Sequence, residues 1–237
     1  MGSAIQSFNP LVFANLNSFE VAKELLDKHK HRIEPLLDVI QKHGLSDAIG
    51  VTLLHKHHNL FADEYLVRQQ DGNVIKTKPE SFLPTGSVPC VWGFAKAFSQ
   101  NQQLDLYPVE FLSSSAKTAK EVSLKSVAAV ENDDFRAEYL AALEKYDVAD
   151  LFGLSLVTSD LFDLKNSETL YETSNGRSST LAPINASDVN KSDSTQTLWL
   201  GKPSITPSII CISHCGAHCK IHCAIHCGMH CRRHNVA

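Results

Sequence analysis

The segment from Cys211 to His234 constrains this chain more than any other, because half of its 24 residues are cysteine or histidine. It reads CISHCGAHCKIHCAIHCGMHCRRH, a four-residue x-x-His-Cys repeat in five copies, with an extra cysteine in front and an extra histidine behind. No folded repeat architecture has so short a period. We therefore interpret the segment as an array of metal ligands or reactive groups and not as a solenoid.

Thiolate and imidazole side chains favour borderline and soft cations, so the array predicts binding of Zn(II) or Cu(I) and disfavours Mg²⁺ and Ca²⁺. Twelve donors could fill three four-coordinate sites, and the protein would then store, buffer or deliver metal. The predicted ligands are Cys211, His214, Cys215, His218, Cys219, His222, Cys223, His226, Cys227, His230, Cys231 and His234.

Two other interpretations of the tail remain open. A folded domain, a polar tether and a Cys-dense C-terminal segment resemble, in organisation only, the precursors of ribosomally made, post-translationally modified peptides. A metal-binding protein would keep its tail, whereas a precursor would lose it after modification. The third interpretation is a low-complexity tail without a specific role.

The rest of the chain predicts an α+β domain over residues 1–172. A flexible linker rich in Ser, Thr and Asn is expected over 173–201, because this stretch has few apolar residues. The repeat tail follows over 202–237. The composition, with 43% hydrophobic and 20% charged residues, is that of a globular protein.

Within the domain, helical spacing predicts an N-terminal helical hairpin, with one helix from Ser18 to about His29 and a second that begins at Pro35. An antiparallel sheet of about four or five strands follows, and Asp71-Gly72 marks a β-hairpin within it. One later helix follows Asp133 and Asp134, whose charges suit a helix N-terminus.

A secondary candidate site lies at the end of a strand predicted over 49–57, where His55 and His57 would project to the same face. The run GVTLLHKHHNLFADE resembles in part the first motif of the cupin family, a family of β-barrel metalloenzymes, although its glycine stands one residue too close and Glu64 too far along. The resemblance implies a metal-dependent enzyme with the two imidazoles as ligands and Asp63 or Glu64 as the third. None of the three tail interpretations needs enzyme activity, so we expect the chain not to be an enzyme.

Charge and hydropathy limit the classes of binding partner that we expect. The net charge is -4, but residues from Ser194 onward carry +4 and residues 1–193 carry -8. An acidic body without a basic stripe argues against nucleic acid, and no apolar run is long enough to span a membrane. With no secretory signal, we expect a reducing cytoplasmic location with free thiols. The expected partners are metal ions and either a modifying enzyme or a metal-receiving protein, and the sequence leaves the oligomeric state open.

Overall fold

The structure is a computed structural model, and it describes residues 7–96, 104–113, 117–190, 194–201 and 209–212. Of the twelve predicted repeat ligands, Cys211 is the one within this part of the chain. The predictions for the other eleven lie outside the described residues.

The helices are α1 (Pro10–Ala14), α2 (Phe19–His29), α3 (Ile33–Lys42), α4 (Lys117–Val130) and α5 (Asp133–Tyr146), with short 3-10 turns at Lys30–Arg32, Thr158–Leu161 and Ala186–Asp188. The strands are β1 (Ile49–Leu53), β2 (Tyr65–Asp71), β3 (Val74–Glu80), β4 (Val88–Lys96), β5 (Leu104–Ser113), β6 (Phe152–Leu156), β7 (Glu168–Asn175), β8 (Ser178–Asn185), β9 (Ser194–Gln196), β10 (Leu198–Trp199) and β11 (Ile209–Ile212). No helix among the described residues is both long enough and apolar enough to cross a membrane.

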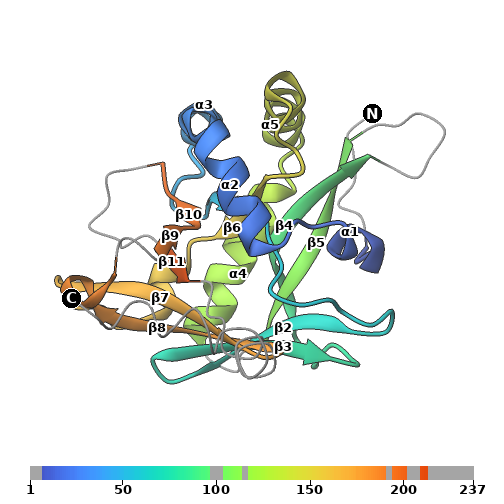
Figure 1. The fold of residues 1–237 in the computed structure, drawn as a ribbon. Helices are drawn as coiled ribbons and strands as arrows, with labels where there is room; N and C mark the ends of the chain where they lie inside the picture. Colours follow the sequence, from blue (N-terminus) through green and yellow to red (C-terminus); the bar gives the residue numbers. More distant parts are fainter. Residues whose placement is uncertain (1–6, 97–103, 114–116, 191–193, 202–208, 213–237) are drawn as a thin grey trace, which may run out of the picture.

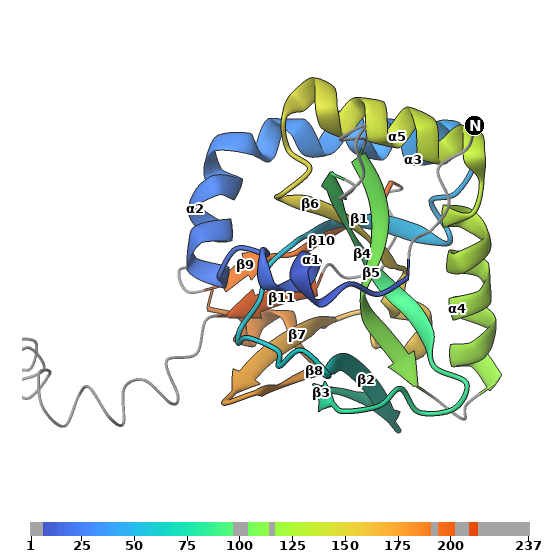
Figure 2. The ribbon, with the colours of Figure 1, turned by 90° about the vertical axis from the view of Figure 1, so that its right-hand side faces the viewer.

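The α+β class is confirmed, but the sheet is larger than the four or five strands predicted. The described strands form one sheet in the order β10-β1-β6-β4-β5-β2-β3-β8-β7-β11-β9. It is mixed and not purely antiparallel, because β2 runs parallel to β5 and β11 runs parallel to β7. The sheet curls, so that β2, β3, β7 and β8 lie at the opposite end of the molecule from α3 and α5 (Figures 1 and 2).

The additional strands come largely from the stretch expected to be a flexible linker, 173–201. It contains the end of β7 and all of β8, β9 and β10. The β7–β8 hairpin turns at Gly176, whose φ of 60° suits glycine. Leu170 and Leu181 are buried on the two strands, so a few well-spaced apolar residues order a polar segment that composition alone assigns to a tether.

The helices and the Asp71-Gly72 hairpin follow local sequence signals. Ser18 caps α2 through its hydroxyl, which accepts a hydrogen bond from the Val21 N–H at 3.4 Å. Helix α3 begins at Ile33, two residues before Pro35. Asn132 caps α5. Helix α4 was not predicted from the sequence.

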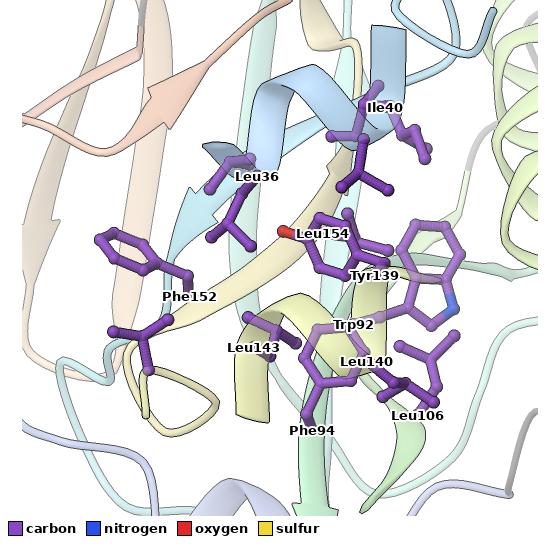
Figure 3. Close-up of a cluster of buried hydrophobic side chains, with 14 of the residues drawn as sticks. Leu36, Ile40, Trp92, Phe94, Leu106, Tyr139, Leu140, Leu143, Phe152 and Leu154 are labelled. Carbon is purple, nitrogen blue, oxygen red and sulfur yellow. The ribbon is translucent and has the colours of Figure 1, made fainter. Parts of the chain in front are cut away.

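A hydrophobic core joins α3 and α5 to the middle of the sheet (Figure 3). The helices contribute one apolar face each, and strands β4, β5 and β6 contribute the side chains opposite. The residues labelled in Figure 3 are Leu36, Ile40, Tyr139, Leu140 and Leu143 from the helices, and Trp92, Phe94, Leu106, Phe152 and Leu154 from the strands.

Replacing Leu36 by alanine tests how much this core contributes to the stability of the fold. The Leu36 side chain is fully buried, so Leu36→Ala should lower the free energy of unfolding by about 2–5 kcal/mol, through lost apolar contact and the cavity left behind. Leu124→Ala is the matched control, because Leu124 also lies on a helix but is 52% exposed. It should cost less than about 0.5 kcal/mol in the same urea titration. Equal losses would contradict this assignment of the core.

Candidate metal centre

The segment that follows β1 places two histidines side by side. Strand β1 ends at Leu53, earlier than the predicted strand over 49–57, and the chain bends at His57 and His58. The Lys56 N–H donates a hydrogen bond to the Asn17 carbonyl at 2.9 Å, and Lys56 forms an isolated bridge with Ser18. His55 and His57 flank Lys56, and the centres of their two rings lie 4.8 Å apart.

The two imidazoles converge through their Nε2 atoms, which lie 3.2 Å apart. The Nδ1 atom of His55 lies 2.9 Å from the Leu53 carbonyl oxygen. Since a carbonyl only accepts hydrogen bonds, Nδ1 carries the proton in neutral His55 and Nε2 presents a lone pair. The ring of Phe19 packs at 5.1 Å from the His55 ring and 5.6 Å from the His57 ring, between ring centres, and limits their rotation.

Strands β7 and β11 bring a carboxylate and a thiol to the same point. In the parallel pairing of these strands, Cys211 stands opposite Glu172. The Cys211 Sγ atom lies 3.5 Å from His57 Nε2 and 4.0 Å from His55 Nε2, and the thiol is hydrogen-bonded to Glu172. One ligand atom from each of the four residues lies within 4.8 Å of the other three. Two nitrogens, a sulfur and a carboxylate oxygen form a donor set suited to zinc.

A row of polar side chains on neighbouring strands extends from this cluster. The Ser179 hydroxyl donates to Glu172 Oε1 at 2.7 Å and orients the carboxylate. Thr77 of β3 stands opposite Ser179 on one side and Arg68 of β2 on the other. Arg68 forms an ion pair with Glu110, with 2.5 Å between Nε and Oε2.

Burial decides the protonation of three of the four candidate ligands. Burial lowers the pKa of both His55 and His57, so both imidazoles are neutral at pH 7. Burial, reinforced by the nearby Glu172 charge, raises the pKa of the Cys211 thiol well above its usual range. Without a metal, Cys211 is therefore a protonated thiol.

Glu172 is the charged member of the cluster. Burial alone would raise the pKa of its carboxyl, but nearby positive charge and the Ser179 hydrogen bond lower it instead. The neighbours whose positive charge lowers this pKa are His57, His55 and then Arg68, and of these Arg68 is the one that carries its charge at pH 7. Arg68 with Glu110 and Glu172 thus gives the region a net charge of about -1.

A divalent cation that converts Cys211 to its thiolate adds one positive charge overall and brings the region close to neutrality. The charges of the metal-free cluster therefore favour binding of a divalent cation and disfavour binding of an anion.

The carboxylate of the cluster is not the one that sequence reasoning expected. Asp63 is exposed, and Glu64 is engaged elsewhere, because both of its oxygens accept hydrogen bonds from Arg177. The carboxylate that lies beside the two imidazoles is therefore that of Glu172 and not that of Asp63 or Glu64. Glu172 lies in a predicted β-prone segment, TLYET, but nothing local distinguishes it from a surface residue.

Cys90 lies outside the cluster and is a poor nucleophile. Its side chain is fully buried in β4, and this burial raises the pKa of the thiol to about 12. The residue is a packing element of the second hydrophobic cluster.

The chain matches no family model, no curated protein and no solved structure.

The protonation state predicts how stability responds to acid in the metal-free protein. Burial also lowers the pKa of His58, from 6.5 to about 4. Below pH 6.5 the unfolded chain binds protons that the folded imidazoles exclude. The stability gained from keeping His55, His57 and His58 neutral is therefore complete above pH 6.5 and is lost as the pH falls toward 4.

Urea unfolding in the presence of a chelator at pH 7.5, 6 and 5 measures this loss. The free energy of unfolding should fall steadily over the series, and His58→Gln should flatten the fall by removing one of the three excluded protons. A variant with the same pH dependence as the unmodified protein would contradict the assignment for His58.

Proposed function

We propose that the protein is a metal-binding protein whose best-defined site holds Zn(II) between His55, His57 and Cys211, with the Glu172 carboxylate in reach as a fourth ligand. The observation that carries the proposal is the convergence of these four donor groups within 4.8 Å. Structural zinc sites are commonly four-coordinate and tetrahedral with N, S and O donors. A carboxylate is a poor partner for Cu(I), so this donor set favours Zn(II) over Cu(I).

The surroundings of the donors support the proposal as much as the donors do. Ligating histidines usually donate their second ring N–H to a carbonyl or carboxylate, and His55 has such a partner in the Leu53 carbonyl. The Glu172 carboxylate is likewise fixed by Ser179. Both imidazoles are neutral at pH 7, so each has one ring nitrogen whose lone pair is available to a metal.

The interior site and the repeat tail share a residue. Cys211 is the first cysteine of the x-x-His-Cys array, and β11 ends one residue after it. A metal bound at Cys211 would fix the start of the array beside the sheet. We propose that the remaining tail donors bind further Zn(II) or Cu(I) for storage, buffering or delivery, with the interior site as the first position of the array.

Cobalt(II) is a direct probe of the interior site, because a Co(II)–thiolate bond gives an intense near-ultraviolet absorption band. We define a tail-serine variant as the full chain with serine in place of the eleven predicted tail ligands after Cys211, which are Cys215, Cys219, Cys223, Cys227, Cys231, His214, His218, His222, His226, His230 and His234. Its remaining cysteines are Cys90 and Cys211. This variant should bind one Co(II) with a thiolate band, and Zn(II) should displace the cobalt.

Substitutions in that background identify the ligands. Cys211→Ser should abolish the thiolate band, and His57→Gln should weaken metal binding by about tenfold or more. Cys90→Ala is the matched control and should leave the band unchanged. A band that survives Cys211→Ser, or the absence of any band in the tail-serine variant, would overturn the proposal.

The intact mass and the metal content of the protein purified from its own source distinguish the precursor interpretation from metal binding. A full-length, unmodified chain that carries two or more metal ions supports metal binding. A shortened chain, or a covalently modified tail, would make the tail a substrate of another enzyme and would reduce the interior site to a secondary role.

A further inference from the structure

A cavity of about 50 Å³ lies against the candidate metal ligands. Its lining includes His55, His57, Glu172 and Arg68, and Thr77 and Ser179 also line it. One water needs about 10–15 Å³ of such space, so the cavity can hold a ligand of roughly four non-hydrogen atoms. The two histidines and Glu172 are each partly exposed.

Arg68 lines the same cavity as the candidate metal ligands and has one donor atom without a partner among the described residues. Arg68 reaches Glu110 through Nε, but its Nη1 atom is buried and has no hydrogen-bond partner among the described residues. A buried guanidinium N–H without a partner is costly, because it has lost water and gained no acceptor. Guanidinium groups pair best with planar oxyanions, which offer two oxygens to the fork of N–H groups.

We infer that this cavity binds a small oxyanion, a carboxylate or a carbonate, which coordinates the bound metal through one oxygen and accepts a hydrogen bond from Arg68 through another. The inference rests on the proposed function, since it needs a metal at His55, His57 and Cys211. Zinc can expand from four to five ligands, so the oxyanion adds to the set without displacing Glu172.

The charges of the region permit one added anion. With a divalent metal and a Cys211 thiolate, the nearby charges of Arg68, Glu110 and Glu172 sum to about zero. A bound monoanion returns this sum to the value of about -1 that the region has without metal. Thr77 and Ser179, short hydroxyl side chains on neighbouring strands between Arg68 and Glu172, leave the space that a ligand of this size needs.

The test uses the full-length tail-serine variant loaded with Co(II), whose visible absorption responds to any new ligand on the metal. Acetate, bicarbonate and benzoate are titrated separately at constant ionic strength. Acetate and bicarbonate should each change the spectrum in a saturable way, and the tighter of the two identifies the preferred class. Benzoate, which has nine non-hydrogen atoms, should cause no change because it exceeds the cavity.

Substitutions in the cavity lining test whether the anion binds beside Arg68. Arg68→Lys keeps the charge but loses the planar fork, and should weaken acetate binding at least about fivefold. Lys165→Gln is the control, because Lys165 is an exposed cation that does not line the cavity, and it should leave acetate binding unchanged. If Arg68→Lys does not fold, Thr77→Leu provides a second test, because a larger side chain would fill the space and should prevent the acetate response while the thiolate band remains.

The outcomes separate this inference from the proposed function. Loss of the thiolate–cobalt band in the unsubstituted tail-serine variant overturns both. A normal band with no saturable response to acetate or bicarbonate overturns the oxyanion site alone. An acetate response that is equal in the Arg68→Lys and Lys165→Gln variants also overturns it, because the anion would then not face Arg68.

Discussion

The arrangement of the candidate centre depends on the pairing of β11 between β7 and β9. Three residue pairs join β11 to β7, and one of them sets Cys211 opposite Glu172. A slip of one residue would turn Cys211 to the other face of the sheet. Ile209 opposes such a slip, because it is buried in the same hydrophobic cluster as Leu170 and has the same parity along the strand as Cys211. The burial of an apolar residue thus directs the thiol inward.

Backbone hydrogen bonds connect this strand to the histidine segment. The Thr197 N–H donates to the Ile209 carbonyl at 2.9 Å, and the Leu53 N–H donates to the Thr197 carbonyl at 2.8 Å. Leu53 in turn offers its carbonyl to His55 Nδ1. Consecutive backbone hydrogen bonds therefore join the segment around Leu53 to Thr197 and Ile209, which lie far along the chain. The donor groups are positioned before any metal binds. Such preorganisation lowers the entropic cost of ordering the ligand side chains when a metal binds.

Local sequence signals predicted the elements that depend on neighbours in the chain. The Asp71-Gly72 turn, the cap at Ser18 and the helix after Asn132 are of this kind. The β7–β8 hairpin carried a comparable signal in Asn175-Gly176, but the abundance of Ser and Thr around it favoured a linker. The closeness of His55 and His57 followed from their spacing of two. Cys211 and Glu172 could not be placed with them, because these contacts are set by the pairing of strands more than a hundred residues further along the chain.

The cluster's chemistry follows from the exclusion of water. The same burial that raises the pKa of Cys211 makes it a poor nucleophile, so a cysteine–histidine catalytic pair, which needs a thiolate, is disfavoured. A divalent metal changes this balance, because it replaces the thiol proton and offsets the negative charge of Glu172 in one step. The cluster combines neutral imidazoles, a carboxylate held by Ser179 and a thiol that ionises only when a metal is bound. These groups favour a cation-binding site over a site for nucleophilic catalysis. The guanidinium N–H of Arg68 that has no partner among the described residues favours a metal site that accepts a further ligand over a closed structural site.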